Sequence, residues 1–135
     1  MAKVDYLKKR AEEFLKGAKF YLEEGNYNLA AFNLEQVAQL YLKYYLFLKL
    51  RDYPKTHSLE ELLGGLAKVY SDKRLEIEKI LRKDASVIGD LEQAYLTSRY
   101  LPVEFSKNRV EKMQDFVKKL IRFLEKSCGE HSESI

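Results

Sequence analysis

Hydrophobic positions recur at helical spacing from the start of the chain. They repeat at steps of three and four with charged residues between them, which is typical of an amphipathic helix. These positions are Val4, Leu7, Ala11, Phe14, Leu15, Ala18, Tyr21 and Leu22. The pair Gly25-Asn26 predicts the end of this first helix, because glycine most readily adopts a left-handed cap.

A second helix is predicted from about Tyr27 to Leu50, ahead of a break at Tyr53-Pro54. From Leu29 to Leu50, 16 of 22 residues are hydrophobic, so apolar side chains cover nearly every side of the helix. One packing face cannot explain this pattern. Several polar residues interrupt the first half, which excludes a membrane span of about 20 predominantly apolar residues. We expect a central helix packed by several neighbours, which could include a second subunit.

The following segments are also helical in pattern. Ser58 followed by Glu61 fits a capping box and predicts the start of a third helix. The next apolar positions are less regular and predict one helix from about Asp72, broken or kinked near Asp84. The segment Tyr95–Pro102 is expected to leave that helix.

The last helix is predicted to be capped by Ser106 and carries a regular apolar stripe. The stripe consists of Val110, Met113, Phe116, Val117, Leu120, Ile121 and Leu124. Five helical segments with short connections predict an all-α fold, an antiparallel up-and-down bundle of four to five helices. We expect the bundle over residues 1–127 and a disordered tail over residues 128–135.

Composition supports a single globular domain. The chain has 135 residues, of which 46% are hydrophobic and 33% are charged. Lys and Arg number 24 against 21 Asp and Glu, and both signs are spread through both halves. This distribution lacks the concentrated basic patch usual in nucleic-acid-binding proteins.

Few residues are suited to metal or redox chemistry. Cys128 is the single cysteine, which excludes an internal disulfide and a cysteine-built zinc site and favours a reducing cytosol. The histidines are His57 and His131, the latter in the expected tail. No metal or cofactor is expected. Residues 1–5 lack the apolar core of a signal peptide, so we expect a cytoplasmic location.

A polar stripe interrupts the apolar second helix. Gln36, Gln39 and Lys43 are spaced by three and four residues and therefore share one face. Polar groups on a packed helix either meet buried partners or line a groove. A solvated stripe on a half-exposed helix is the simpler alternative.

The segment Arg51–Ser58 holds a second candidate site. Arg51 could hold a phosphate while His57, which titrates near neutral pH, moves a proton. Such a pair is the smallest set of side chains that could support metal-free RNA cleavage. A capping or packing role for His57 is the alternative.

A third candidate lies where the kinked helix is expected to end. Arg99 stands near Tyr95 and directly before Tyr100, so stacking and phosphate binding could occur together. The alternative is a helix terminus at which the arginine satisfies backbone carbonyls.

Taken in order, these motifs resemble the HEPN domain family. The resemblance is carried by Gly25-Asn26-Tyr27, Gln36-Val37-Ala38 with Lys43 beyond, Thr56-His57-Ser58-Leu59 and Ser98-Arg99-Tyr100. It covers roughly residues 5–125. The resemblance implies an up-and-down helical bundle that is often dimeric. Many prokaryotic members are encoded beside a small nucleotidyltransferase and help to bind its nucleotide or another substrate.

Other branches of the resembled family are metal-independent ribonucleases, including toxins of toxin–antitoxin systems. They carry an arginine, a polar residue and a histidine at a loose spacing that Arg51, Asp52 and His57 satisfy. However, the nuclease branches usually carry this pair on a late helix, often with a tyrosine after the histidine, where Ser58 follows here. Gln39 also stands where relatives commonly have glutamate.

The favoured hypothesis is a non-catalytic, cytoplasmic HEPN-type homodimer that binds a nucleotide or RNA, or assists a minimal nucleotidyltransferase. Lys43 and Arg99 would meet phosphate, Gln36 would donate a hydrogen bond and Tyr100 would stack on a base. The expected ligand-binding residues are therefore Gln36, Lys43, His57, Arg99 and Tyr100. One alternative is a metal-independent ribonuclease using Arg51 and His57, and another is a helical adaptor without a ligand.

Overall fold

The computed structural model describes residues 2–129, and describes residues 2–4, 98 and 99 by their backbone alone. This part of the chain contains six α-helices, one 3₁₀ turn and no strand, which confirms the all-α class. The elements are α1 (Ala2–Glu24), α2 (Tyr27–Leu50), α3 (Leu59–Val69), η1 (Ser71–Lys73), α4 (Arg74–Lys83), α5 (Ala85–Tyr100) and α6 (Lys107–Ser127).

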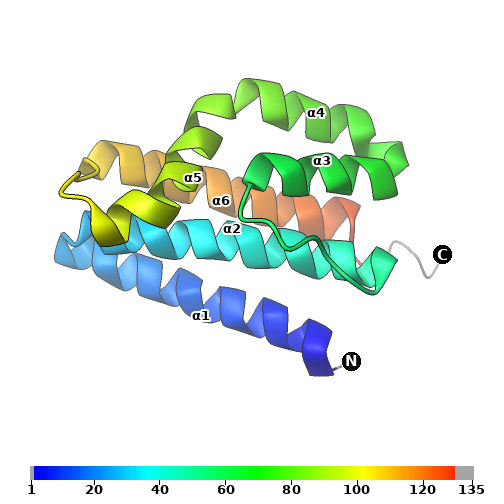
Figure 1. Ribbon diagram of the computed structural model, residues 1–135, viewed down its shortest axis with the longest axis horizontal. Helices are drawn as coiled ribbons and strands as arrows, with labels where there is room; N and C mark the ends of the chain where they lie inside the picture. The colour runs from blue at the N-terminus through cyan, green and yellow to red at the C-terminus, as the bar shows by residue number, and fades with distance from the viewer. Residues whose placement is uncertain (1, 130–135) are drawn as a thin grey trace.

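The helices form a bundle around α2. The packing partners of α2 are α1, α3, α5 and α6, while α4 lies outside on α3 and α5. Figure 1 shows α1 running opposite to α2 along its length, and α4 covering α3 on the outer side. The segment after α2 leads the chain back across the bundle, so α3 runs in the same direction as α2.

The first two helices end where the sequence predicts. Gly25 adopts a φ of 82° directly after α1, in the region that glycine enters without a Cβ clash. Arg51 caps α2 with a φ of 60°, and its N–H donates to the carbonyl of Phe47 at 2.8 Å. The predicted bounds Tyr27–Leu50 of the second helix are confirmed.

Serine side chains cap α3 and α6, as predicted. The Ser58 hydroxyl accepts a hydrogen bond from the N–H of Glu61 at 3.1 Å, and the Ser106 hydroxyl accepts from Arg109 at 3.2 Å. In a complete capping box, the side chain of Glu61 would accept a hydrogen bond from the N–H of Ser58. Here that N–H donates to the Thr56 hydroxyl at 3.1 Å instead. Each cap satisfies an amide that the first helical turn leaves without a partner.

The region from Asp72 to Pro102 departs from the sequence prediction in two ways. The break at Asp84 is complete enough to separate α4 from α5, which raises the number of helices to six. The helix was expected to end at Tyr95, but α5 continues to Tyr100, so that boundary is wrong. Leu101 becomes extended because Pro102 disfavours a helical conformation in the residue before it.

The apolar sides of α2 are covered within one chain. Its buried residues are Ala30, Ala31, Leu34, Glu35, Val37, Ala38, Gln39, Tyr41, Leu42, Tyr44, Tyr45 and Leu46. A second subunit is therefore not needed to explain the all-round apolar pattern. No helix in the described range 2–129 is long and apolar enough to cross a membrane.

The last helix, α6, ends at Ser127, and the two residues after it pack against the bundle. Cys128 and Gly129 are buried, and the N–H of Cys128 donates to the carbonyl of Leu124 at 2.8 Å. Burial raises the pKa of the Cys128 thiol to about 12, so it stays protonated and packs as a small apolar group. The rest of the predicted tail, residues 130–135 with His131, lies outside the described residues.

Leu42 provides a test of the central role of α2. Because its side chain is completely buried, Leu42→Ala should lower the free energy of unfolding by about 2–5 kcal/mol. Leu75→Ala on α4, whose side chain is 73% exposed, should change it by no more than about 0.5 kcal/mol. Urea unfolding followed by helical circular dichroism measures both, and equal effects would contradict the packing.

Candidate functional site

A buried carboxylate lies at the centre of the polar stripe on α2. Glu35 is fully buried, and its two oxygens accept hydrogen bonds from side-chain amides of the same helix. Gln36 Nε2 donates to Oε1 at 2.8 Å, and Gln39 Nε2 donates to Oε2. A buried charge requires such partners, so both glutamines are engaged inside the bundle.

Lys43 lies two turns further along α2 and is half-buried. Burial lowers the pKa of its ammonium, and the negative charge of Glu35 partly opposes this shift. The Nζ atom lies 5.4 Å from the ring centroid of Tyr53, a cation–π contact with the segment that follows α2. Lys43 therefore interacts electrostatically with a buried carboxylate and contacts an aromatic ring.

His57 is exposed and lies against α5. Its Nε2 forms a hydrogen bond of 3.0 Å with the hydroxyl of Tyr95, and the two rings stack with centroids 4.3 Å apart. One turn earlier on α5, Glu92 accepts hydrogen bonds from the Ser58 hydroxyl at 3.2 Å and from the N–H of Glu60 at 3.0 Å. Its carboxylate faces the positive end of α3, where negative charge is favourable.

Sequence reasoning missed these contacts of α5. The sequence indicates Tyr95 only as a neighbour of Arg99 and gives no sign of a role for Glu92. The spacing of three residues places both on one face of a helix. Their partners lie more than thirty positions away in the chain, so sequence spacing alone could not pair them.

Arg51 and His57 lie near opposite ends of an irregular linker, residues 51–58. Arg51 is exposed at the end of α2, and no side-chain hydrogen bond or ion pair of Arg51 occurs among the described residues. Asp52 accepts a hydrogen bond from the N–H of Tyr53 at 2.8 Å, a local turn contact. No helix connects the two predicted catalytic residues.

The end of α5 presents Tyr100 to solvent. Its side chain is 70% exposed. The backbone of Arg99 is helical, but its side chain lies outside the described residues. The predicted roles of Arg99 and Tyr100 therefore stay predictions.

We use the term polar face for Lys43, Tyr53, His57 and Tyr95. The linker supplies two of these residues, α2 supplies one and α5 supplies one. A cleft of about 620 Å³ between α5 and α6 is lined by other residues than these four. The polar face is consequently a surface site.

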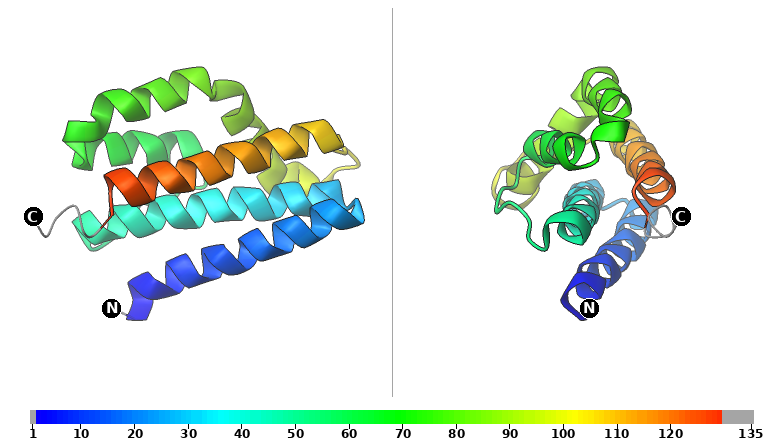
Figure 2. Two further views of the ribbon diagram at one scale, coloured as in Figure 1. Left: turned by 180° about the vertical axis from the view of Figure 1, so that it is seen from behind. Right: turned by 90° about the vertical axis from the view of Figure 1, so that its right-hand side faces the viewer.

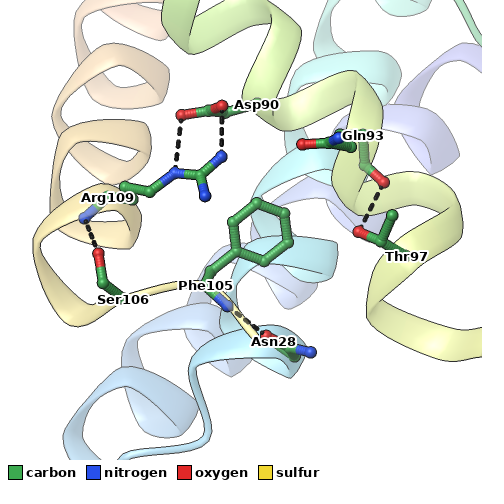
Figure 3. A network of polar contacts seen from close by, with 7 residues as sticks. All are labelled: Asn28, Asp90, Gln93, Thr97, Phe105, Ser106 and Arg109. Atoms are coloured by element: carbon green, nitrogen blue, oxygen red, sulfur yellow. Dashed lines mark hydrogen bonds and ion pairs between the residues drawn. The ribbon is translucent and has the colours of Figure 1, made fainter. Parts of the chain in front are cut away.

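A second polar network joins α5, α6 and the start of α2, as Figure 3 shows. Arg109 forms two hydrogen bonds with Asp90, at 2.6 and 3.3 Å, which raise the pKa of its guanidinium. Its guanidinium also lies 4.8 Å from the ring centroid of Phe105. Asn28 accepts from the N–H of Phe105 at 2.8 Å and donates to the carbonyl of Val103 at 2.6 Å. This network fixes the α5–α6 connection against α2.

The residue types that commonly bind metals do not cluster in the part of the chain that the structure describes. Within the described residues, no three His, Cys, Asp or Glu side chains form a group that could hold a metal ion.

This protein is therefore an all-α helical bundle around an apolar central helix. Its second helix and the linker carry a polar face. The sequence model of the HEPN domain matches residues 4–127, nearly the whole chain. The protein belongs to the HEPN family. No curated protein and no solved structure matches it.

The electrostatic link between Glu35 and Lys43 can be tested by titration. Because the carboxylate raises the pKa of Lys43 against the effect of burial, Glu35→Gln should lower that pKa further. Titration of the Lys43 Nζ signal by NMR measures the shift. Glu12→Gln, an exposed position on α1, should leave it unchanged. An unchanged or higher pKa in Glu35→Gln would show that the two charges do not interact.

Proposed function

We propose that this HEPN protein binds a nucleotide, free or at the end of an RNA, on its polar face and does not cleave it. The nucleotide is held for a partner nucleotidyltransferase. Membership of the HEPN family supports a nucleotide- or RNA-related function.

The position of Lys43 carries this proposal. Its ammonium is half-buried beside a tyrosine ring, with a lowered pKa caused by desolvation. A phosphate that approaches from solvent would supply a second counter-charge to this poorly solvated cation. Glu35, whose charge acts on Lys43, is itself bonded to two glutamines, and no ion pair joins it to Lys43 among the described residues.

Aromatic rings at the polar face and beyond it on α5 suit a nucleobase. Tyr53 contacts Lys43 directly, and His57 stacks on Tyr95 at the other end of the linker. Tyr100 is exposed one turn beyond Tyr95 on α5. Stacking on such rings is tolerant of base identity. Arg99 remains the proposed second phosphate ligand.

The geometry favours binding over cleavage. A general acid or base needs a free nitrogen within about 2.6–3.2 Å of the reacting oxygen. Nε2 of His57 is bonded to Tyr95, which leaves Nδ1 as the ring nitrogen for acid or base chemistry, and Arg51 lies at the other end of the linker. A ribonuclease would have to use Nδ1 of His57 or break the hydrogen bond between His57 and Tyr95.

We also propose a homodimer, formed through the end of the bundle. Exposed apolar side chains occur at the start of α2, at the end of α5 and in the connection to α6. They are Leu29, Leu96, Tyr100, Leu101 and Val103, with exposures between 43% and 70%. Asn28 brings two of these segments together by its bond to Val103. A grouping of exposed apolar residues marks an interaction surface.

Nucleotide binding is tested by calorimetric titration with ATP, GTP, CTP and UTP. At least one should bind, and Tyr100→Ala should weaken its affinity about 5- to 150-fold, the loss of one stacked base. Lys43→Met should weaken it at least about tenfold through the lost charge. Tyr6→Ala, another exposed tyrosine, should have no effect.

The same samples distinguish the alternatives. Absence of binding by the wild type to all four nucleotides and to single-stranded RNA would leave the adaptor hypothesis. RNA should stay intact without added metal. Cleavage that His57→Ala and Arg51→Ala both abolish, with folding retained, would make the ribonuclease hypothesis correct.

The dimer is tested by sedimentation at micromolar concentration. The wild type should sediment as two chains, and Leu101→Glu with Val103→Glu should give a monomer of 15.9 kDa. Leu75→Glu, at an exposed leucine of α4, should remain dimeric. Sedimentation of Tyr100→Ala shows whether its loss of nucleotide binding reflects assembly. A monomeric wild type would contradict the dimer.

A further inference from the structure

The linker, residues 51–58, supplies two of the four residues of the polar face although it has no regular secondary structure. Among the described residues, side-chain contacts hold it to helices of the bundle near its start and near its end. Near the start, the ring of Tyr53 contacts Lys43 and lies 6.4 Å from the ring of Phe47, both on α2. Near the end, two consecutive residues contact α5. Figure 2 (right) shows the linker on the side of the bundle opposite α6, where α5 also lies.

The carboxylate of Glu92 on α5 joins the end of the linker to the first turn of α3. One oxygen, Oε2, accepts hydrogen bonds from the hydroxyl of Ser58 at 3.2 Å and from the N–H of Glu60 at 3.0 Å. The Ser58 hydroxyl in turn accepts from the N–H of Glu61 at 3.1 Å. A serine hydroxyl has one proton to donate, so these bonds together fix its orientation. Ser58 is thus held by two helices.

His57 directly precedes Ser58 and is held by the same face of α5. Its ring stacks on Tyr95 with centroids 4.3 Å apart, and Nε2 forms a hydrogen bond of 3.0 Å with the Tyr95 hydroxyl. Tyr95 follows Glu92 by three residues, which places both on one face of the helix. Two neighbouring side chains of α5 therefore hold two consecutive residues of the linker. Because consecutive Cα atoms are only about 3.8 Å apart, a displacement of Ser58 would also move His57.

The formation of α3 does not depend on Glu92. Ser58 caps this helix, and Glu60 and Glu61 already place negative charge at its positive end. A third carboxylate at this helix end adds like-charge repulsion. The packing of α3 in the bundle depends on five buried side chains, which are Leu59, Leu62, Leu63, Leu66 and Ala67. The position of Glu92 is therefore better explained by the hydrogen bonds that hold the end of the linker.

We propose that Glu92 is a positioning residue of the polar face, which keeps His57 on Tyr95 and so in place for the nucleotide. This inference rests on the proposed nucleotide site. Glu92 does not touch the ligand and acts through His57, whose exposed ring keeps Nδ1 on the side not engaged by Tyr95. A linker that is ordered before binding loses less conformational freedom when the nucleotide binds, which raises the affinity.

Calorimetric titration of the full chain with ATP, GTP, CTP and UTP tests this role. Glu92→Ala should weaken the affinity for the nucleotide that binds best about three- to tenfold, the effect of one side chain that is no longer held in place before binding. Glu92→Gln keeps an oxygen that can accept both hydrogen bonds, so its affinity should stay close to that of the wild type. Glu60→Gln removes a negative charge from the same helix end but no acceptor of the linker, and should also match the wild type.

A double-mutant cycle shows whether Glu92 acts through His57. His57→Ala should weaken nucleotide binding, and Glu92→Ala should cause no further loss in the His57→Ala background, because the side chain that it positions is then absent. NMR gives a readout that needs no ligand. The NOEs between the rings of His57 and Tyr95 should weaken in Glu92→Ala and persist in Glu92→Gln. Circular dichroism checks that each variant keeps its helices.

Several outcomes would overturn the role of Glu92 while the nucleotide site stands. They are an unchanged affinity in Glu92→Ala, an equal loss in Glu92→Gln or in Glu60→Gln, and an equal loss with and without His57. Absence of nucleotide binding by the wild type would overturn the proposed function, and with it the role of Glu92 in binding. The NOEs then still show whether Glu92 positions His57, which keeps the two failures apart.

Discussion

The enclosure of α2 on all sides is the constraint that organises this protein. A helix whose apolar side chains cover nearly its whole circumference must be covered by several neighbours. Here α1, α3, α5 and α6 provide that cover, and the chain crosses back through the linker so that α3 can join them. The position of the linker, and thus of Tyr53 and His57, follows from this requirement.

The polar residues of α2 acquire their roles from the same enclosure. Glu35 is fully buried, so its charge must be matched within the bundle. Gln36 and Gln39 supply hydrogen bonds, and Lys43 supplies a positive charge at the edge of the buried region. The buried network and the candidate binding site are therefore linked on one helix through Lys43.

The break at Asp84 allows the two helices on either side of it to pack against different parts of the bundle. It separates α4, which packs on α3, from α5, which packs on α2. From its position α5 holds α3 through Glu92, the linker through Tyr95 and α6 through Asp90. The same separation leaves α4 away from α6 and creates a groove between them.

The sequence by itself determined the helices, because their periodicity, caps and breaks are local. The ends of α1 and α2, the serine caps and the break at Asp84 could all be predicted from neighbouring residues. The end of α5 was misplaced, because Pro102 sets it and the polar residues before the proline remain helical. Glu35, Gln36 and Gln39 lie close in the chain, yet only burial shows that they form one network.

Tertiary structure alone decided which distant side chains meet. The pairing of His57 with Tyr95 and of Asp90 with Arg109 depends on how helices pack, and neither pair has a characteristic sequence spacing. The groove likewise depends on the distance between two helices that are separated in the chain. Local patterns therefore determined the helices. Long-range packing, which no short segment encodes, determined which polar side chains meet.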